Sequence, residues 1–245
     1  MEFFLPIVFV IISFIYSSIG LGGGSSYTAL MAITGVSYKL IPTTSLALNL
    51  FVTFIGMLNF WKSGHGRLDL IGPFLITSIP MAYFAGSLDL REEVFQIILT
   101  ASLILIAIRI YIYDNLTIIY QLSVFKRWIV IVFLGLGLGF ISGAVGIGGG
   151  IYLVPLIIMF GLGSPKEASA AGAMFIWANS LAGFIARYNM NTFDANFIFP
   201  LIIAVIVGGF LGSYFGSMRY TAKTMEKIMG AVIILAVVLM LRNML

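Results

Sequence analysis

The sequence predicts an all-α polytopic membrane protein built from two inverted repeats, each a glycine-broken helical hairpin followed by three transmembrane helices. Three observations lead to this fold class. Hydrophobic residues fill 61% of the 245 positions and charged residues only 9%, too few to cover a globule in water. Apolar runs of roughly 20 residues, the length of a helix that crosses a bilayer, alternate with short polar links. Two glycine strings, GLGGG at 20–24 and GIGGG at 146–150, lie in corresponding places of the two halves.

The glycine strings begin at positions 20 and 146, and the offset of 126 residues (146 − 20) also brings other landmarks into register. The matched landmarks are Gly35 with Gly161, Leu30 with Leu156, and YFAGS at 83–87 with GFLGS at 209–213. A shared offset at several landmarks indicates an internal repeat. We expect a single membrane domain over 1–245, with repeat one at 3–113, a linker at 114–127 and repeat two at 128–241.

Each repeat contains five apolar segments in the same order. They are 3–21, 25–34, 41–61, 68–88 and 93–113 in the first half, and 128–145, 151–162, 168–188, 196–217 and 224–241 in the second. The first segment has Glu2 in place of a basic flank and no signal-cleavage pattern after it, so we expect it in the mature fold. As a helix, the second segment of each half rises only about 15 to 18 Å, too little to span a membrane alone.

The lysines and arginines predict how the short second segment runs. If it returns the chain to the side where the first segment began, nine of the 13 fall on one face and four on the other. The nine are Lys62, Arg67, Arg109, Lys126, Arg127, Lys166, Arg219, Lys223 and Lys227. If it completes a broken first helix instead, the division is six to seven. The positive-inside rule favours the hairpin, in a multi-pass protein of the cytoplasmic membrane with both termini outside. Each half then crosses an odd number of times, which inverts the second half.

The glycine strings predict a binding site inside the membrane. Open backbone groups at membrane depth are tolerated only against protein or a water-filled cavity. The short segment after each string begins with unpaired N–H groups and a positive dipole end, which can hold an anion without a charged side chain. Inverted repeats would bring both strings to one site near the midplane. The expected substrate-binding residues are Gly22, Gly23, Gly24, Ser25, Ser26, Asn49, Gly148, Gly149, Gly150, Tyr152 and Asn179.

Small and polar residues in membrane helices also have structural explanations. Glycines allow helices to pack closely, and this is the role we expect for Gly208, Gly212 and Gly216, which are spaced four apart. The amides of Asn49 and Asn179 are costly to bury without a partner. They either complete the anion site or form hydrogen bonds between helices, and the sequence leaves both alternatives open.

The remaining residues exclude several classes of function. All nine acidic residues lie at the ends of apolar runs or in links, whereas cation pathways and proton relays need a buried carboxylate. The strings lack the lysine of a P-loop and the spacing of a dinucleotide motif. Without cysteine or a catalytic set, we expect no enzyme, no metal site and no cofactor. The net charge of +4 reflects topology and not a nucleic-acid partner, and Arg109 and Arg187 are expected to reach the interface from helix ends.

The glycine strings resemble those of the TauE/SafE sulfite exporter family, also called the four-toluene-sulfonate uptake permeases. The resemblance covers essentially the whole chain and is most specific at GIGGGIYLVPLI, residues 146–157. It also implicates Gly20, Gly146 and Pro155, while Ala29 stands at the position of Pro155 in the first half. It implies transport of sulfite, sulfonates, sulfoacetate or related small organic anions across the cytoplasmic membrane.

We therefore expect a secondary transporter that moves a small anion, namely sulfite, a sulfonate or a related organosulfur anion, by alternating access. The alternatives are a transporter of another carboxylate or inorganic anion, and a non-transporting structural subunit of a membrane complex. A structural subunit would explain the apolar composition but not the paired glycine strings. The expected partners are the anionic substrate and membrane lipid, with a homodimer left open.

Overall fold

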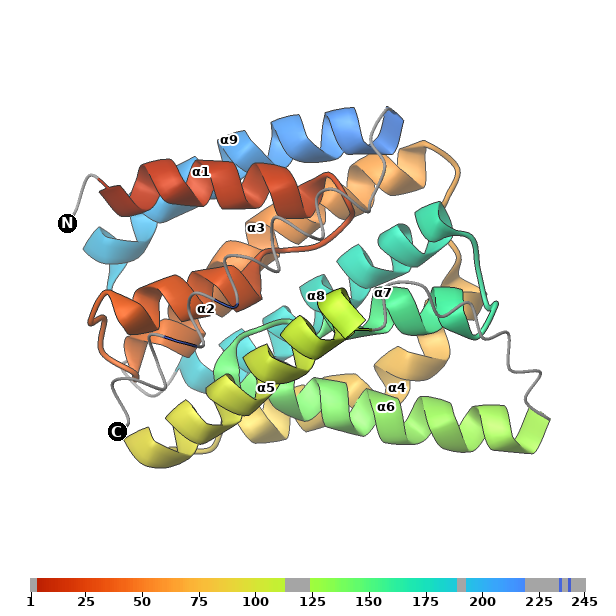
Figure 1. Ribbon diagram of the computed structural model, residues 1–245, viewed down its shortest axis with the longest axis horizontal. Helices are drawn as coiled ribbons and strands as arrows, with labels where there is room; N and C mark the ends of the chain where they lie inside the picture. Colours follow the sequence, from red (N-terminus) through yellow and green to blue (C-terminus); the bar gives the residue numbers. More distant parts are fainter. Residues whose placement is uncertain (1–3, 113–123, 189–192, 219–233, 235–237, 239–245) are drawn as a thin grey trace.

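The computed structural model describes residues 4–112, 124–188 and 193–218, together with Ile234 and Val238. Side chains are described over a smaller range, which leaves out Arg109 and Gly216. Apart from Ile234 and Val238, the expected segment 224–241 also lies outside the described residues. The described residues form nine α-helices and no strands (Figure 1). The helices are α1 (Phe4–Ser17), α2 (Gly24–Ile33), α3 (Leu40–Lys62), α4 (Leu68–Gly86), α5 (Glu92–Ile112), α6 (Val124–Val145), α7 (Gly150–Met159), α8 (Pro165–Tyr188) and α9 (Ala195–Met218).

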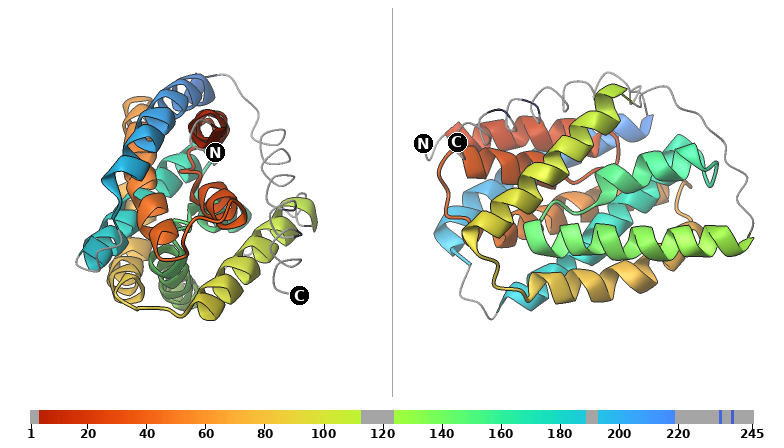
Figure 2. Two further views of the ribbon diagram at one scale, coloured as in Figure 1. Left: turned by 90° about the vertical axis from the view of Figure 1, so that its left-hand side faces the viewer. Right: turned by 60° about the horizontal axis from the view of Figure 1, so that its bottom comes forward.

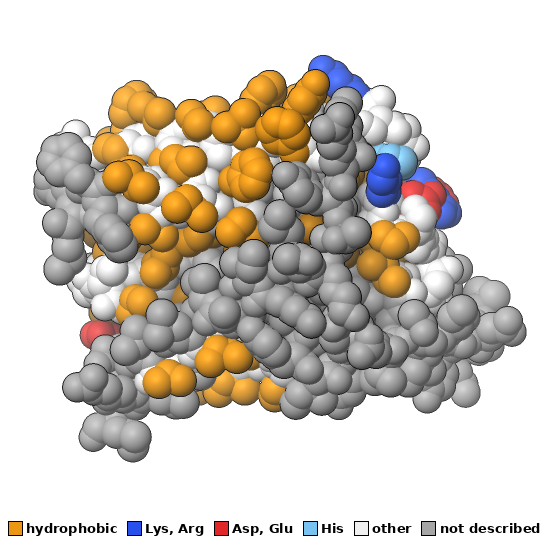
Figure 3. Space-filling view, turned by 45° about the horizontal axis from the view of Figure 1, so that its top comes forward, with side chains coloured by type: hydrophobic (Ala, Val, Ile, Leu, Met, Phe, Trp, Pro, Cys, Tyr) orange, Lys and Arg blue, Asp and Glu red, His pale blue; other side chains and the backbone are white. Residues whose placement is uncertain are grey.

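Within the described residues, five helices are long and apolar enough to cross a membrane: α3, α4, α8, the Trp128–Val145 part of α6, and α9 as far as Phe215. Apolar side chains cover the outside of the molecule, and Ile76 and Phe133 are each 71% exposed. Figure 3 shows hydrophobic side chains spread over the described part of one face, while most of the charged side chains in view lie at one end. Such a surface is unfavourable in water and suits hydrocarbon. The all-α polytopic membrane architecture predicted from the sequence is therefore confirmed.

Two helices begin three or more residues earlier than the apolar pattern predicts. α6 begins at Val124, inside the expected linker 114–127. α8 begins at Pro165 and not at 168, because the links also carry helix-starting residues. The Ser164 backbone N–H donates to Glu167 at 2.7 Å, and the Glu167 N–H donates to the Ser164 hydroxyl at 3.3 Å. This capping box, with proline in the first helical position, starts the helix one turn ahead of the apolar run.

α3 and α8 form the centre of the bundle. In each of them 67% of the membrane-spanning window is buried, compared with 33% in α4 and 39% in α9. α1 and α9 lie together on one side of this pair, and α4 and α6 lie together on the opposite side (Figures 1 and 2). Each outer pair thus joins one helix from each half of the sequence.

Glycines allow both outer pairs to pack closely. A methyl group added to Gly208 or Gly212 of α9 would overlap the backbone carbonyls of Val10 and Phe14 in α1, respectively. The packing role predicted for Gly208 and Gly212 is therefore confirmed. In α6, the corresponding stripe is Gly135, Gly139 and Gly143, which meets Phe74, Ser78 and Ala82 of α4 in turn. Because contacts advance in the same direction along both helices, the two helices of each outer pair run parallel.

Candidate functional site at the glycine breaks

Each glycine string interrupts the helical backbone. α1 ends at Ser17 and α2 begins at Gly24, while α6 ends at Val145 and α7 begins at Gly150. The residues that precede the short helices, Gly23 and Gly149, have φ angles of 92° and 70°. This left-handed conformation is readily adopted only by glycine, which explains the residue type at both positions. Figure 1 shows that the chain reverses direction at each break, since α2 runs back beside α1 and α7 runs back from the end of α6.

The two breaks touch each other in the interior of the bundle. Gly22 to Ser26 and Gly148 to Gly150 are all buried. A methyl group on Gly24 would lie 2.7 Å from the carbonyl oxygen of Ile147 and 2.8 Å from that of Gly146. Only glycine allows the first turn of α2 to approach the second string this closely. The expected meeting of the two strings is therefore found.

Asn49, from the middle of α3, lies between the two strings. Its amide nitrogen donates a hydrogen bond to the Gly146 carbonyl at 3.3 Å. The same nitrogen is 2.6 Å from the position of a methyl group on Gly24 and 3.1 Å from that on Gly148. The amide oxygen faces Gly22 and has no hydrogen-bond partner among the described residues. Asn49 therefore contacts backbone from both halves of the chain.

Ser45, one turn earlier on α3, completes the polar contact with the breaks. Its hydroxyl donates to the Gly146 carbonyl at 2.7 Å and lies 3.4 Å from the Gly24 carbonyl. The carbonyl of Gly146 thus accepts hydrogen bonds from two side chains of α3. These donors offset the negative end of that one carbonyl dipole.

α8 approaches the breaks from the other side. A methyl group on Gly20 would lie 2.6 Å from the Ser169 carbonyl oxygen, near the start of α8. Methyl groups on Gly148 and Gly150 would lie 2.7 and 2.5 Å from side-chain carbons of Ile176. The first string therefore packs on the central helix of the second half, and the second string packs on central helices of both halves.

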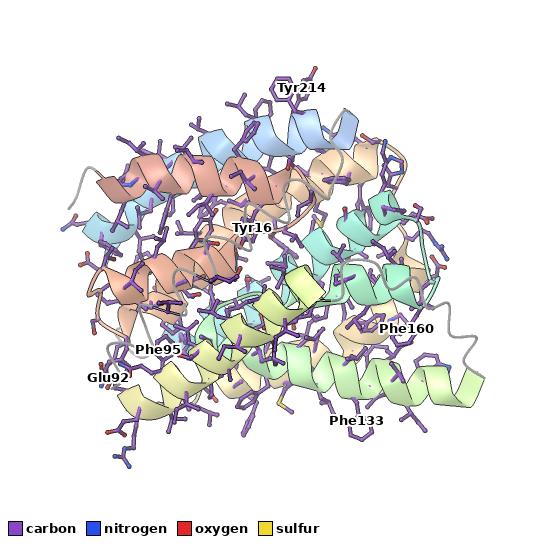
Figure 4. All side chains as sticks on the ribbon, viewed as in Figure 1. Tyr16, Glu92, Phe95, Phe133, Phe160 and Tyr214 are labelled. Atoms are coloured by element: carbon purple, nitrogen blue, oxygen red, sulfur yellow. The ribbon has the colours of Figure 1, made fainter. Side chains whose placement is uncertain are left out.

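Ser25 and Ser26 turn toward α1. Their hydroxyls form hydrogen bonds with the Tyr16 hydroxyl at 2.9 and 2.7 Å, respectively. Tyr16 projects from α1 toward α2 in Figure 4, and this contact fastens the first hairpin. Tyr152, at the position of Ser26 in the second half, donates its hydroxyl to the Ser102 carbonyl of α5. The two hairpins are thus fixed to different neighbours.

Asn179 forms a local hydrogen bond. Its amide nitrogen donates to the Phe175 carbonyl at 2.8 Å, one turn earlier in α8, and its amide oxygen has no partner among the described residues. This contact differs from that of Asn49, which reaches a break. Of the two asparagines, Asn49 is the one held against the glycine strings by a hydrogen bond.

Arg187 does not reach the interface as expected from its place near the end of α8. Its side chain is only 6% exposed. The guanidinium Nε and Nη2 atoms donate to the Gly143 carbonyl at 3.3 Å, and Nη2 also donates to the Ala144 carbonyl at 2.9 Å. The expectation was wrong because the C-terminus of α6 offers buried acceptors that attract a cation more strongly than the interface does. No local sequence signal distinguishes this arginine from one that reaches the interface.

The glycine breaks contain backbone donors that could hold an anion, and no charged side chain is needed for this. Neither Gly23 nor Gly149 provides a side-chain cap for the helix that follows. The N–H groups of Gly24, Ser25 and Ser26 in α2 and of Ile151 in α7 have no backbone partner among the described residues, and each helix adds the positive end of its dipole. The N–H groups of Gly150 and Tyr152 donate to the carbonyls of Gly148 and Gly149. Within the described residues, no group of three or more His, Asp or Glu side chains could hold a metal ion.

Comparison with known proteins gives a consistent picture. A family model described as "Sulfite exporter TauE/SafE" matches residues 5–240. The chain is 30% identical to the probable membrane transporter protein y4hK of Sinorhizobium fredii over 243 residues, which cover 95% of both proteins. It is 25% identical to YjnA and 27% identical to YunE, two probable membrane transporter proteins of Bacillus subtilis, over 89% of this chain and 91% and 89% of theirs. No solved structure matches the chain significantly.

Proposed function

Because the chain belongs to the sulfite exporter TauE/SafE family of membrane transporters, we propose that it carries a small sulfur oxyanion, sulfite or a sulfonate, across the cytoplasmic membrane. The observation that carries this proposal is the meeting of the two glycine breaks around Asn49. There, two uncapped helix N-termini lie in the interior of a membrane protein, where N–H groups and dipoles favour an anion. A sulfur oxyanion presents several acceptor oxygens to such donors.

The second part of the proposal is that the two halves are inverted repeats that work by alternating access. In Figure 1, α1 and α6 run in opposite directions, as the first helices of inverted copies would. An exchange of the halves also converts the α1 and α9 pair into the α6 and α4 pair. Both breaks are buried in this structure. This is the arrangement expected of an occluded state, from which rocking of one half against the other would open either side.

Flux measurements on the full chain reconstituted alone in proteoliposomes test the proposed function. We expect saturable flux of radiolabelled sulfite that competes with methanesulfonate. Gly23→Val should abolish it, because a β-branched side chain resists a φ of 92° and an added Cβ would lie 2.7 Å from the Tyr27 ring. Gly72→Val is the matched control, because no atom lies within 4 Å of the position of an added methyl group.

Three outcomes would contradict the proposal. Flux of a carboxylate or an inorganic anion in place of sulfite would change the substrate class. The absence of flux with every anion would favour a structural subunit. Undiminished flux in folded Gly23→Val protein would remove the breaks from the site.

A further inference from the structure

Arg187 is a buried cation that has no carboxylate at ion-pair distance among the described residues, although Asp89 lies near enough to interact with it electrostatically. The other two arginines whose side chains are described, Arg67 and Arg91, are more exposed and pair with Asp69 at 2.6 Å and Glu93 at 2.9 Å. Arg187 forms no ion pair within the described part of the chain, although its side chain is only 6% exposed. Backbone carbonyls satisfy some of its N–H groups without cancelling its charge. Asp89 offsets this charge only from beyond ion-pair distance, and a buried charge is costly without a close anionic partner.

A cavity of about 230 Å³ adjoins this guanidinium. It lies at the end of the bundle where α3 and α5 begin and where α6 and α8 end. Two more charged residues line it, Lys39 and Asp89, so that its lining carries two positive charges and one negative charge. Guanidinium Nη1 has no hydrogen bond among the described residues, which leaves two N–H donors for a ligand.

The walls of the cavity indicate the kind of anion. Tyr38 and Phe95 form an aromatic pair with ring centroids 6.3 Å apart, and both line the cavity together with Leu90. Phe95 is labelled in Figure 4 near the start of α5. The volume lies below the roughly 300 to 1,000 Å³ of pockets for drug-sized ligands. A small oxyanion with a short apolar group fits both the charge and the walls.

We propose that this cavity, lined by Arg187, Lys39 and Asp89, is a second anion site that holds the transported oxyanion before or after it occupies the glycine breaks. The proposal rests on the proposed function for the identity of its ligand. Arg187 supplies a planar fork of donors and Lys39 a second positive charge. Asp89 opposes binding, so that the anion is held weakly enough to move on.

The position of Arg187 links this site to the breaks. Its guanidinium binds the carbonyls of Gly143 and Ala144, and Ala144 lines the cavity. These residues lie just before the second glycine string at 146–150. An anion in the cavity is therefore next to the segment that leads into the proposed central site.

A labelling experiment tests the charge preference of the cavity without requiring transport. The chain contains no cysteine, so Leu90→Cys places one thiol in the wall of the cavity. Purified full-length protein is treated with an anionic methanethiosulfonate reagent, the sulfonatoethyl derivative, or with its cationic trimethylammonium analogue. Ser87→Cys, at the exposed C-cap of α4, is the matched control because Ser87 does not line the cavity.

We expect the ratio of anionic to cationic labelling rates to be about tenfold higher at Leu90→Cys than at Ser87→Cys, since the net positive charge of the cavity lining concentrates anions. Lys39→Gln should lower this ratio and Asp89→Asn should raise it. Methanesulfonate should protect Leu90→Cys and not Ser87→Cys. Arg187→Lys keeps the positive charge but loses the planar fork of guanidinium donors. It should therefore weaken protection by methanesulfonate more than it lowers the ratio of anionic to cationic labelling rates.

Equal ratios at the two cysteines, or no change with Lys39→Gln and Asp89→Asn, would overturn the second site. Lys39 and Asp89 are exposed, so their substitutions test the second site even if variants of Arg187 fail to fold. The flux assay tests the transport proposal independently of the labelling experiment. Normal sulfite flux without a charge preference at Leu90→Cys contradicts only the second site, whereas a charge preference without flux of any anion contradicts only the transport proposal.

Discussion

Asn49 and Asn179 are both buried asparagines of central helices, and their surroundings separate the two roles that their residue type allows. The amide of Asn49 bonds to Gly146 in the opposite half of the chain, and the amide of Asn179 bonds one turn back in its own helix. Each retains an amide oxygen without a partner among the described residues. Of the two asparagines, only Asn49 forms a hydrogen bond with the backbone of a glycine break.

Substitution of these residues should separate transport from stability. We expect Asn49→Asp to reduce sulfite flux by at least tenfold, because a carboxylate beside the breaks repels an anion in a low dielectric. Asn179→Asp should reduce flux much less than Asn49→Asp does. The measurement is initial rate of flux in proteoliposomes, with thermal unfolding in detergent as the check on folding. Equal losses of flux in the two variants would show that Asn49 has no special place in the site.

At the scale of helices, the outer pairs are held by small residues. α6 meets α4 through Gly135, Gly139 and Gly143, and α9 meets α1 through Gly208 and Gly212. Lipid tails solvate apolar side chains as well as protein does, so close backbone packing stabilises helix pairs in a membrane. Because each pair joins the two halves of the chain, these glycines contribute to the packing of one half on the other.

Alanine substitution tests this packing within one helix. In Gly139→Ala, the new methyl group would overlap the Ser78 carbonyl of α4, and we expect destabilisation of about 1–3 kcal/mol. Gly137→Ala has no atom within 4 Å of the new group and should be neutral or slightly stabilising, since alanine favours a helix by roughly 0.5–1 kcal/mol over glycine. Thermal unfolding in detergent measures both. If Gly139→Ala were as stable as Gly137→Ala, the close approach of α4 and α6 would contribute little.

At the scale of the whole molecule, the proposed mechanism places two anion sites of different character in series. The central site consists of backbone groups around Asn49, and the second site carries Arg187, Lys39 and Asp89 near one end of the bundle. Charged groups at the end attract the anion, and uncharged dipoles in the centre bind it without trapping it. Tyr16 holds α2 to α1 within the first half, whereas Tyr152 of α7 bonds to α5 of the first half, so of these two contacts only the second joins the halves.

Alternating access predicts opposite changes at the two breaks. Ser26 and Ile151 are 0% and 4% exposed. In oriented proteoliposomes with methanesulfonate on one side only, single cysteines at these positions should gain access to a membrane-impermeant reagent from opposite faces. Saturating substrate on both sides should protect both. Simultaneous access to both cysteines from one face would instead indicate a continuous pore.

The sequence by itself determined the membrane class, the order of the described helices and the position of both breaks. Composition and the length of apolar runs suffice for the first two, because hydrocarbon imposes the same requirement on every spanning segment. The breaks follow from runs of glycine, which no helix interior favours. The start of α8 at Pro165 could have been predicted from the capping pattern of Ser164 and Glu167, which apolar periodicity does not register.

Only the tertiary structure decided which polar groups meet. Asn49 and Gly146 are 97 positions apart in the sequence, and Arg187 binds carbonyls 43 and 44 positions away. Residue type and local spacing give the same pattern for an arginine that reaches the interface and for one that caps a neighbouring helix. The difference lies in where the ends of α6 and α8 come together. That position depends on the packing of the whole bundle, since a hydrogen bond across the fold requires both partners to be brought within about 3 Å.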